Sequence, residues 1–340
     1  DAAIQVSEWF RKKGFRTCIL KGQGNALLYP VGLHRTPGDI DIWVEGGDKR
    51  VISFVRSISP HEKACYHHIE FPSYKGVEVE VHYRPSFLLC FWHNRKLQKY
   101  YERVKEEQFS HRVMLGEQGE IAIPTVEFNL IFQLTHIYAH LMNEGIGVRQ
   151  LLDYYYVLCD FYKVYQKSSK ITPSLFTLKE GSTSHPDPLS SGAREKTALR
   201  CSEPLCYKDG GPSKVSPDCA GWDRLGVVQK ELKELGLWKF AGAIMYIMQE
   251  VFGMPASRLI VPPNEKYGRF VLNEVLEAGN FGKHDERNRF GRSKLGHNLQ
   301  RVYRDMRLMG YFPAEALSEP FFRVWHFFWR LRWDFTYRLR

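Results

Sequence analysis

The strictest periodic signal in this chain is the alternation of apolar and polar residues over Val77–His82, which reads VEVEVH. Successive side chains of a strand point to opposite faces, so this alternation predicts a strand with one buried and one solvated face. Two further strands are expected at Thr17–Leu20 and Asp39–Val44. Apolar residues at helical spacing predict helices over residues 2–13, Asn25–Tyr29 and Lys49–Ser57. The first part of the chain is therefore expected to form a small α/β unit.

Beyond Pro124 the apolar spacing becomes helical. Helices are expected over Glu127–Tyr162 with a break near Gly145 and Gly147, and over Leu225–Phe252, Tyr267–Glu277, Leu295–Met309 and Phe321–Arg338. Residues 166–221 are rich in Ser, Pro and Gly, which is typical of an insertion of low order.

The expected fold class is α+β, with a mixed sheet followed by a helical domain. The expected domains are an α/β domain at 1–105, a connecting strand or linker at 106–123, a helical domain at 124–165 and 222–340, and the insertion at 166–221.

Composition restricts the class of protein. With 44% apolar residues the chain falls in the globular range, and its longest apolar run, Phe240–Met248, is about half of the ~20 residues that a membrane helix needs. We therefore expect no transmembrane segment. The seven cysteines lack the spacing of a disulfide framework, and no signal-peptide pattern opens the chain, so a cytoplasmic location is expected. Because the first residue is Asp1 rather than Met, we expect a fragment or a processed product.

The formal charge of +10 suits a phosphate-bearing or acidic partner. Much of the excess lies in Lys283–Arg307 and Arg323–Arg340. Nucleic acid, a nucleoside triphosphate and an acidic protein all remain open as partners of this basic C-terminal half.

The most specific chemical motif is GDIDIWV, which spans Gly38–Val44. On a strand, Asp39 and Asp41 share one face, and the hard carboxylate oxygens that they offer suit Mg2+. In the strand Val77–His82, Glu78, Glu80 and His82 also share a face. If the two strands are neighbours, Glu80 completes a site of three carboxylates, whereas Glu78 is expected to belong to the solvated face.

A glycine-rich turn, Leu20-Lys-Gly-Gln-Gly-Asn25, joins the first strand to a helix. Glycines in such a turn let backbone N–H groups approach a phosphate, and Lys21 adds a positive charge. The P-loop pattern is missing, so the turn alone is not diagnostic.

These motifs together resemble the nucleotidyltransferase fold of the DNA polymerase beta superfamily. More narrowly, the chain resembles a bacterial group of uncharacterised nucleotidyltransferases, in which an LKG turn, an Arg and DID precede an acid–x–His strand and a helical region. Here these features are Lys21-Gly22, Arg35, Asp39–Asp41, Glu80-Val-His82, His136-x-x-x-His140 and Arg149–Asp153, and the C-terminal PFFR segment at Pro320 is similar as well.

The resemblance implies roles for these residues. Asp39, Asp41 and Glu80 would be catalytic and would ligate two Mg2+ ions, with Mn2+ as an alternative. Lys21, Gly22, Gly24 and Arg35 would bind the nucleotide, for which ATP is expected. The chain departs from the superfamily in having Lys21-Gly22 at the phosphate turn instead of Gly-Ser, and Glu80 where Asp is commoner.

Five other features carry less weight as functional sites. His136 and His140 lie one helical turn apart and should pack or hydrogen-bond inside the helical domain, and Arg149 should pair with Asp153 on a helix surface. His67-His68 should lie in a surface loop. A zinc knuckle of Cys201, Cys206, Cys219 and His185 lacks clear ligand spacing. The C-terminal aromatic and arginine-rich segment, residues 320–340, should be an amphipathic helix that covers the domain.

Three functions remain open at this point. The first is Mg2+-dependent transfer of a nucleoside monophosphate from an NTP to a hydroxyl acceptor. The second is a catalytically degenerate module that binds nucleotide, nucleic acid or a protein. The third is an antitoxin-like enzyme that adds AMP to a protein.

Overall fold

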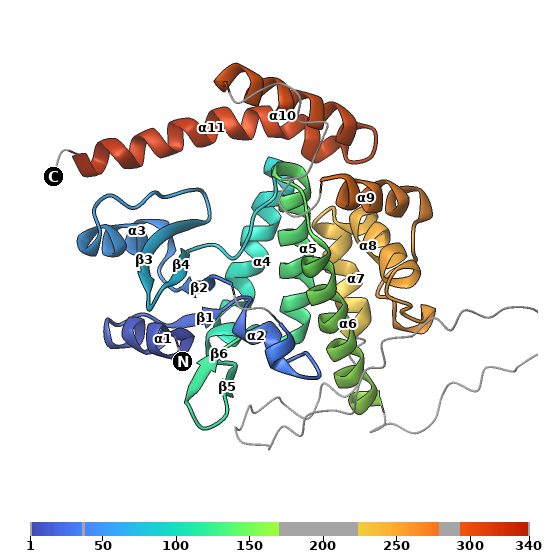
Figure 1. Ribbon diagram of the computed structural model, residues 1–340, viewed down its shortest axis with the longest axis horizontal. Coiled ribbons are helices and arrows are strands. Elements are labelled where there is room, and N and C mark those ends of the chain that lie inside the picture. Colours follow the sequence, from blue (N-terminus) through green and yellow to red (C-terminus); the bar gives the residue numbers. More distant parts are fainter. Residues whose placement is uncertain (1, 36–37, 170–223, 279–292, 339–340) are drawn as a thin grey trace, which may run out of the picture.

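The structure is a computed structural model that describes residues 2–35, 38–169, 224–278 and 293–338. An N-terminal α/β unit lies beside a group of helices, and a C-terminal helical hairpin runs above both (Figure 1). This arrangement confirms the expected α+β class.

The α/β unit is built on a mixed four-stranded sheet of order β1-β2-β4-β3. Its strands are β1 (Thr17–Ile19), β2 (Ile40–Val44), β3 (His68–Tyr74) and β4 (Val77–His82). Strands β2 and β4 are parallel, and the other two pairings are antiparallel. The parallel pairing joins two strands that are not consecutive in the sequence.

One face of the sheet is a buried apolar core. Alternation in β2 turns Ile40, Ile42 and Val44 toward this core, where they meet helices α1 (Ala2–Lys12) and α3 (Gly47–Ile58). Asp41 and Trp43 consequently point to the opposite face of the sheet. Trp43 stacks on Phe128 of the helical part, with ring centroids 5.8 Å apart, and so connects the sheet to the second core.

The remaining elements form the helical part and its connections. They are α2 (Gln23–Ala26), a 3-10 turn at Gly32–His34, α4 (Phe91–Ser110), the hairpin β5 (Arg112–Met114) with β6 (Glu120–Ala122), α5 (Val126–Asn143), α6 (Val148–Ser169), α7 (Arg224–Glu234), α8 (Trp238–Glu250), a 3-10 turn at Ala256–Arg258, α9 (Glu265–Ala278), α10 (Lys294–Met309) and α11 (Pro313–Arg338).

Three differences from the sequence-based expectation have physical reasons. The strand β3 carries an irregularity between Phe71 and Tyr74, and this interrupts the alternation that would have revealed it. The helix expected over Leu225–Phe252 is divided into α7 and α8 at Gly236, whose φ of 73° is left-handed. Helix α11 begins at Pro313 rather than Phe321, because it continues through Pro320.

Helix α4 was not predicted either, and it lies partly beyond the expected boundary at residue 105. Its sequence is rich in charged residues, so the buried positions Leu97, Tyr100 and Tyr101 form only a narrow apolar stripe. Most of the expected insertion, the zinc-knuckle residues and Lys283–Arg292 lie outside the described residues, although α6 extends to Ser169. Within the described ranges no helix has both the length and the apolar character to cross a bilayer.

Helix α11 contacts both cores. Trp329 and Trp333 pack against the core of the α/β unit, and Phe322 packs against the helical core. Arg56 of α3 donates a hydrogen bond to the carbonyl oxygen of Trp333 at 3.0 Å. The C-terminal helix therefore contacts both parts and brings its own side chains close to the sheet. It is not the amphipathic helix that was expected, because Phe321, Phe327 and Phe328 are exposed.

Candidate active site

The two predicted acidic motifs meet because β2 and β4 are parallel neighbours. Asp41 lies directly opposite Glu80 in their register, and Asp39 comes just before β2. One carboxylate oxygen from each of Asp39, Asp41 and Glu80 lies within 4.8 Å of the others. We call these three residues the acidic cluster. The structure thus brings together the three carboxylates that the sequence suggested.

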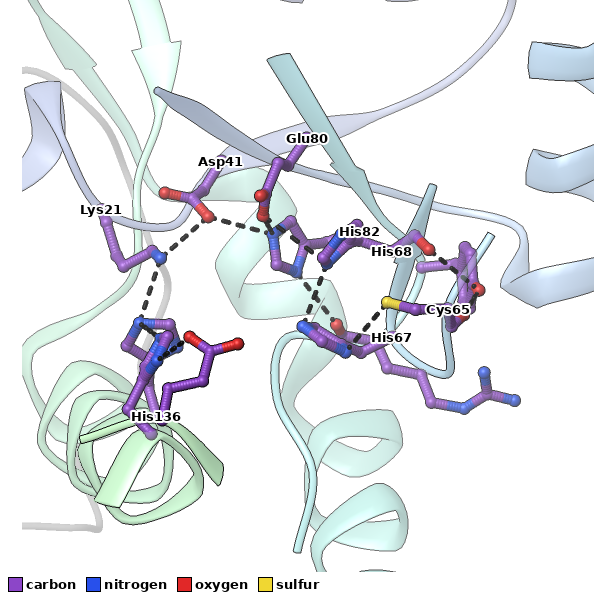
Figure 2. Close-up of polar contacts among 12 residues, drawn as sticks. Lys21, Asp41, Cys65, His67, His68, Glu80, His82 and His136 are labelled. Atoms are coloured by element: carbon purple, nitrogen blue, oxygen red, sulfur yellow. Dashed lines mark hydrogen bonds and ion pairs between the residues drawn. The ribbon is translucent and has the colours of Figure 1, made fainter. Parts of the chain in front are cut away.

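Asp41 is the most buried member of the acidic cluster, at 2% exposure. Its Oδ1 atom forms an ion pair with Lys21 Nζ at 2.8 Å and contacts His82 Nε2 at 3.0 Å (Figure 2). Two basic side chains therefore converge on one oxygen. This convergence shows that the negative potential of the cluster already attracts cations.

The charges in the cluster are mutually dependent. Burial opposes ionisation of Asp41, but Lys21 and His82 hold the pKa of its carboxyl well below the usual range. Burial opposes protonation of His82, yet hydrogen bonds to Asp41 and Glu80 raise the pKa of its imidazole to about 9. Burial likewise opposes the charge on Lys21, and Asp41 and Asp39 raise its pKa. At neutral pH, Asp41 is thus an anion between two cations.

The other two carboxylates differ in environment. Burial, reinforced by the charge of Asp41, raises the pKa of Asp39. For Glu80, burial is outweighed by His82 and His68, which lower the pKa of its carboxyl. A divalent cation would replace the positive charge that Lys21 and His82 now supply. Three convergent oxygen donors of this kind fit a hard divalent cation such as Mg2+.

The glycine-rich turn lies against the acidic cluster. Gly22 has a left-handed φ of 57°, and a Cβ added there would lie 3.5 Å from the carbonyl oxygen of Asp39. That distance is ordinary van der Waals contact, so the left-handed φ, rather than lack of space, favours glycine at this position. Gly24 has a packing reason to be glycine, because its added Cβ would lie 3.2 Å from Ile123 Cγ2. The nucleotide-binding roles of Lys21, Gly22 and Gly24 remain predictions.

Arg35 is held by a buried carboxylate of the helical part. Its guanidinium makes two hydrogen bonds of 2.9 Å to Asp153 of α6, and Tyr29 donates a further bond of 2.7 Å to the same carboxylate. The expected surface pair of Arg149 with Asp153 is wrong, because Asp153 is buried against Arg35 whereas Arg149 is exposed. Arg35 thus joins the loop before the acidic cluster to α6, and its nucleotide-binding role remains a prediction.

Histidines next to the cluster were missed as site residues. His82 bridges Asp41 and Glu80, at 3.0 and 3.4 Å. His136 of α5 lies 3.1 Å from Lys21 Nζ and also 3.1 Å from His140. The available signal for His82 was that it shares a strand face with Glu80. Nothing in the sequence placed α5, and with it His136, beside Lys21.

The expectation that His67-His68 lies in a surface loop is wrong. His68 opens β3, is partly buried and lies 3.5 Å from Glu80. His67 contacts His68 at 3.0 Å and Cys65 Sγ at 3.4 Å (Figure 2). Burial and the neighbouring His68 and His82 hold the pKa of His67 well below the usual range. A polar chain therefore continues from the acidic cluster to β3.

The comparison with known families agrees with this geometry. Residues 1–165 match the profile of a family described as uncharacterised nucleotidyltransferase. This segment belongs to that family. The matched range includes the acidic cluster, the glycine-rich turn, and α5 and α6 with His136 and Asp153. The resemblance found in the sequence is thereby confirmed for residues 1–165, whereas the similarity at Pro320 lies outside the match, and the nucleotidyltransferase domain supports a general role in nucleotidyl transfer.

No curated protein and no solved structure gives a significant match to the chain.

Proposed function

We propose that this protein is a Mg2+-dependent nucleotidyltransferase that moves a nucleoside monophosphate from an NTP, ATP in the first instance, to a hydroxyl group. The observation that carries the proposal is the convergence of Asp39, Asp41 and Glu80 beside the Lys21-Gly22 turn. A nucleotidyltransferase needs a cation site next to a phosphate-binding turn. The family match over residues 1–165 supports nucleotidyl transfer as the chemistry of this site.

In the proposed reaction the acceptor oxygen forms a bond to the α-phosphorus of the NTP. The bond from this phosphorus to the bridging oxygen of the β-phosphate breaks, and pyrophosphate leaves. The hydroxyl proton passes to Glu80, whose carboxyl is ionised because His82 and His68 lower its pKa. Asp39, Asp41 and Glu80 would hold the Mg2+ ions, which when bound neutralise phosphate charge and favour the attacking hydroxyl.

Lys21 is placed to bind the triphosphate. Its Nζ lies 2.8 Å from Asp41 and 3.1 Å from His136, and the side chain is 18% exposed. An ammonium held at this point can turn from Asp41 to a phosphate oxygen that enters beside Gly22. His136 contacts the ammonium of Lys21 through Nε2. Burial, together with the charge of Lys21, keeps the pKa of the His136 imidazole well below the usual range.

The test is isothermal titration of ATP, GTP, CTP and UTP with and without Mg2+. The proteins are the wild type, the double variant Asp39→Asn/Asp41→Asn and a control, Glu78→Gln, which changes an exposed acid on the strand that carries Glu80. We expect binding that depends on Mg2+ in the wild type and the control and is lost in the double variant. Asp41→Asn alone should abolish transfer.

Thermal melting of each variant checks that the fold is retained. If no NTP binds to the folded wild type, the proposal is wrong, and a catalytically degenerate binding module becomes the better description.

A further inference from the structure

A cavity of about 430 Å³ lies beside the acidic cluster. Its walls come from Cys65–His68 before and within β3, from the loop after β4 with Phe87, from His136–Glu144 on α5, and from the helices α10 and α11. The volume is within the range of about 300–1,000 Å³ that small-molecule sites occupy. We call it the basic cavity, for the reason given below.

The basic cavity adjoins the candidate active site. His68 lines it and lies 3.5 Å from Glu80, and His136 lines it and lies 3.1 Å from Lys21. In the sheet order β1-β2-β4-β3, the acidic cluster on β2 and β4 lies between the Lys21 turn after β1 and the cavity wall at β3. A ligand in this cavity would therefore approach Glu80 from the side of β3.

The far wall of the cavity carries positive charge. Arg301 of α10 and Arg323 and Arg330 of α11 line it, against the two acids Glu144 and Glu319. Glu319 is shared by Arg301 at 3.5 Å and Arg323 at 3.6 Å, which are longer than direct hydrogen bonds. Arg323 also donates to Asn298 at 3.4 Å. The arginines outnumber the carboxylates that line the cavity, and the long contacts to Glu319 can be exchanged for a bound anion.

The middle of the cavity is aromatic. Phe87 and Phe322 stack in parallel, with centroids 5.3 Å apart and planes 12° apart. Beside them, Nε2 of His326 is buried and has no hydrogen-bond partner among the described residues. The cavity thus combines arginines, an apolar surface with a buried unpaired polar atom, and His68, which lies 3.5 Å from Glu80, and this combination suits a ligand with a polar group at each end and carbon between them.

We propose that the basic cavity binds the acceptor of the transfer reaction, a small molecule that carries a hydroxyl group and an anionic group, either phosphate or carboxylate. The anion lies at Arg301, Arg323 and Arg330, the carbon skeleton lies against Phe87 and Phe322, and the hydroxyl faces Glu80. The proposal rests on the proposed function and names the substrate class for the same site.

The experiment uses the full chain and three probes, namely glycerol 3-phosphate, glycerate and inorganic phosphate, at millimolar concentration. Binding is measured by calorimetry, with and without Mg2+ and a nonhydrolysable ATP analogue. The first two probes distinguish a phosphate from a carboxylate as the anion, and inorganic phosphate shows whether the hydroxyl-bearing skeleton contributes.

Two kinds of variant locate the binding. Arg323→Gln/Arg330→Gln removes charge from the cavity wall, and Arg332→Gln is the control, an exposed arginine on the same helix outside the cavity. Ala139→Phe fills the cavity from α5 and leaves the arginines in place. Thermal melting establishes that each variant is folded.

We expect glycerol 3-phosphate or glycerate to bind the wild type more tightly than inorganic phosphate does, and both cavity variants to weaken this binding by about tenfold or more. The Arg332→Gln control should bind the probe as tightly as the wild type does. The affinity of the cavity variants for the ATP analogue should also remain unchanged. If no probe binds the wild type, or if folded cavity variants bind as the wild type does, the proposal is overturned. Loss of analogue binding in the cavity variants would also overturn the proposal, because it would show that the cavity binds the NTP and not the acceptor.

These outcomes are separate from failure of the proposed function. That function is tested by the Asp39→Asn/Asp41→Asn variant and the NTPs, whereas the cavity is tested by anions that need not contact the acidic cluster.

Discussion

In the α/β unit, the polar groups of the candidate site come from strands that are hydrogen-bonded to each other, whereas in the helical part they come from separate helices. Asp41 and Glu80 are fixed by one pair of parallel strands. His136, Asp153 and Arg323 come from α5, α6 and α11, and each reaches the site by packing. The backbone ladder thus sets the acidic cluster, and side-chain packing sets its surroundings.

This difference suggests that the two regions position their side chains with different precision. Strand register has no intermediate positions, because a shift of one residue turns a side chain to the other face. Helix packing tolerates smaller adjustments, so the residues around the cluster can differ while the carboxylates stay in place. Changes at the junction of the two regions should therefore affect stability, and changes on the strands should affect catalysis.

The largest effect is expected where the regions are joined by Asp153. Asp153→Ala would leave Arg35 buried without its carboxylate, which should lower the free energy of unfolding by about 3–5 kcal/mol. Urea denaturation measures the change, and Arg149→Ala, an exposed position on the same helix, should be within about 0.5 kcal/mol of the wild type. Equal effects of the two variants would show that the junction is not stabilised by this pair.

A smaller effect is expected on the strand side, from Glu80→Asp. The shorter side chain keeps the charge but withdraws the carboxylate by about 1 Å, which should slow NTP-dependent pyrophosphate release by about a hundredfold. Stability should change little, because Glu80 is only partly buried. Glu78→Asp on the same strand is the matched control, and a rate for Glu80→Asp equal to that of the control would remove Glu80 from the mechanism.

The helical part should show a pH dependence at Asp305. Burial and the nearby Glu319 raise the pKa of Asp305 from 3.8 to about 7. Since the folded pKa exceeds the unfolded one, folding takes up a proton, and the stability that this contributes is lost as pH rises from about 4 to about 7. Asp305→Asn should therefore stabilise the protein more at about pH 8 than at about pH 5, as measured by urea denaturation at both values. A gain that does not depend on pH would contradict the assignment.

The smallest effect is expected at the start of α10. The side chain of Ser293 accepts a hydrogen bond from the backbone N–H of Gly296 at 3.0 Å and so caps the helix. Ser293→Ala should cost about 1 kcal/mol of unfolding free energy, whereas Ser293→Asp should retain the cap. Should the two variants have the same melting temperature, the cap would not contribute to stability.

The sequence determined the local elements of this protein and the identity of its acids. Alternation fixed β2 and β4, and it placed Asp39 with Asp41 on one side of the first strand and Glu80 with His82 on one side of the second, because a strand has a period of two. Helical spacing gave α5, α9 and α10 to within a few residues, whereas α6 runs on to Ser169 beyond the expected end at Tyr162. The α+β class and the family resemblance followed from the order of these elements.

Only the tertiary structure decided which residues meet. The parallel pairing that sets Asp41 opposite Glu80 joins strands separated by α3 and β3, and no local pattern encodes such a register. The pairing of Arg35 with Asp153 and the place of His68 beside Glu80 likewise depend on contacts between distant segments. Periodicity reports which face of an element is buried, but it does not say what that face is buried against. The acids were therefore readable from the sequence, and the histidines and arginines around them were not.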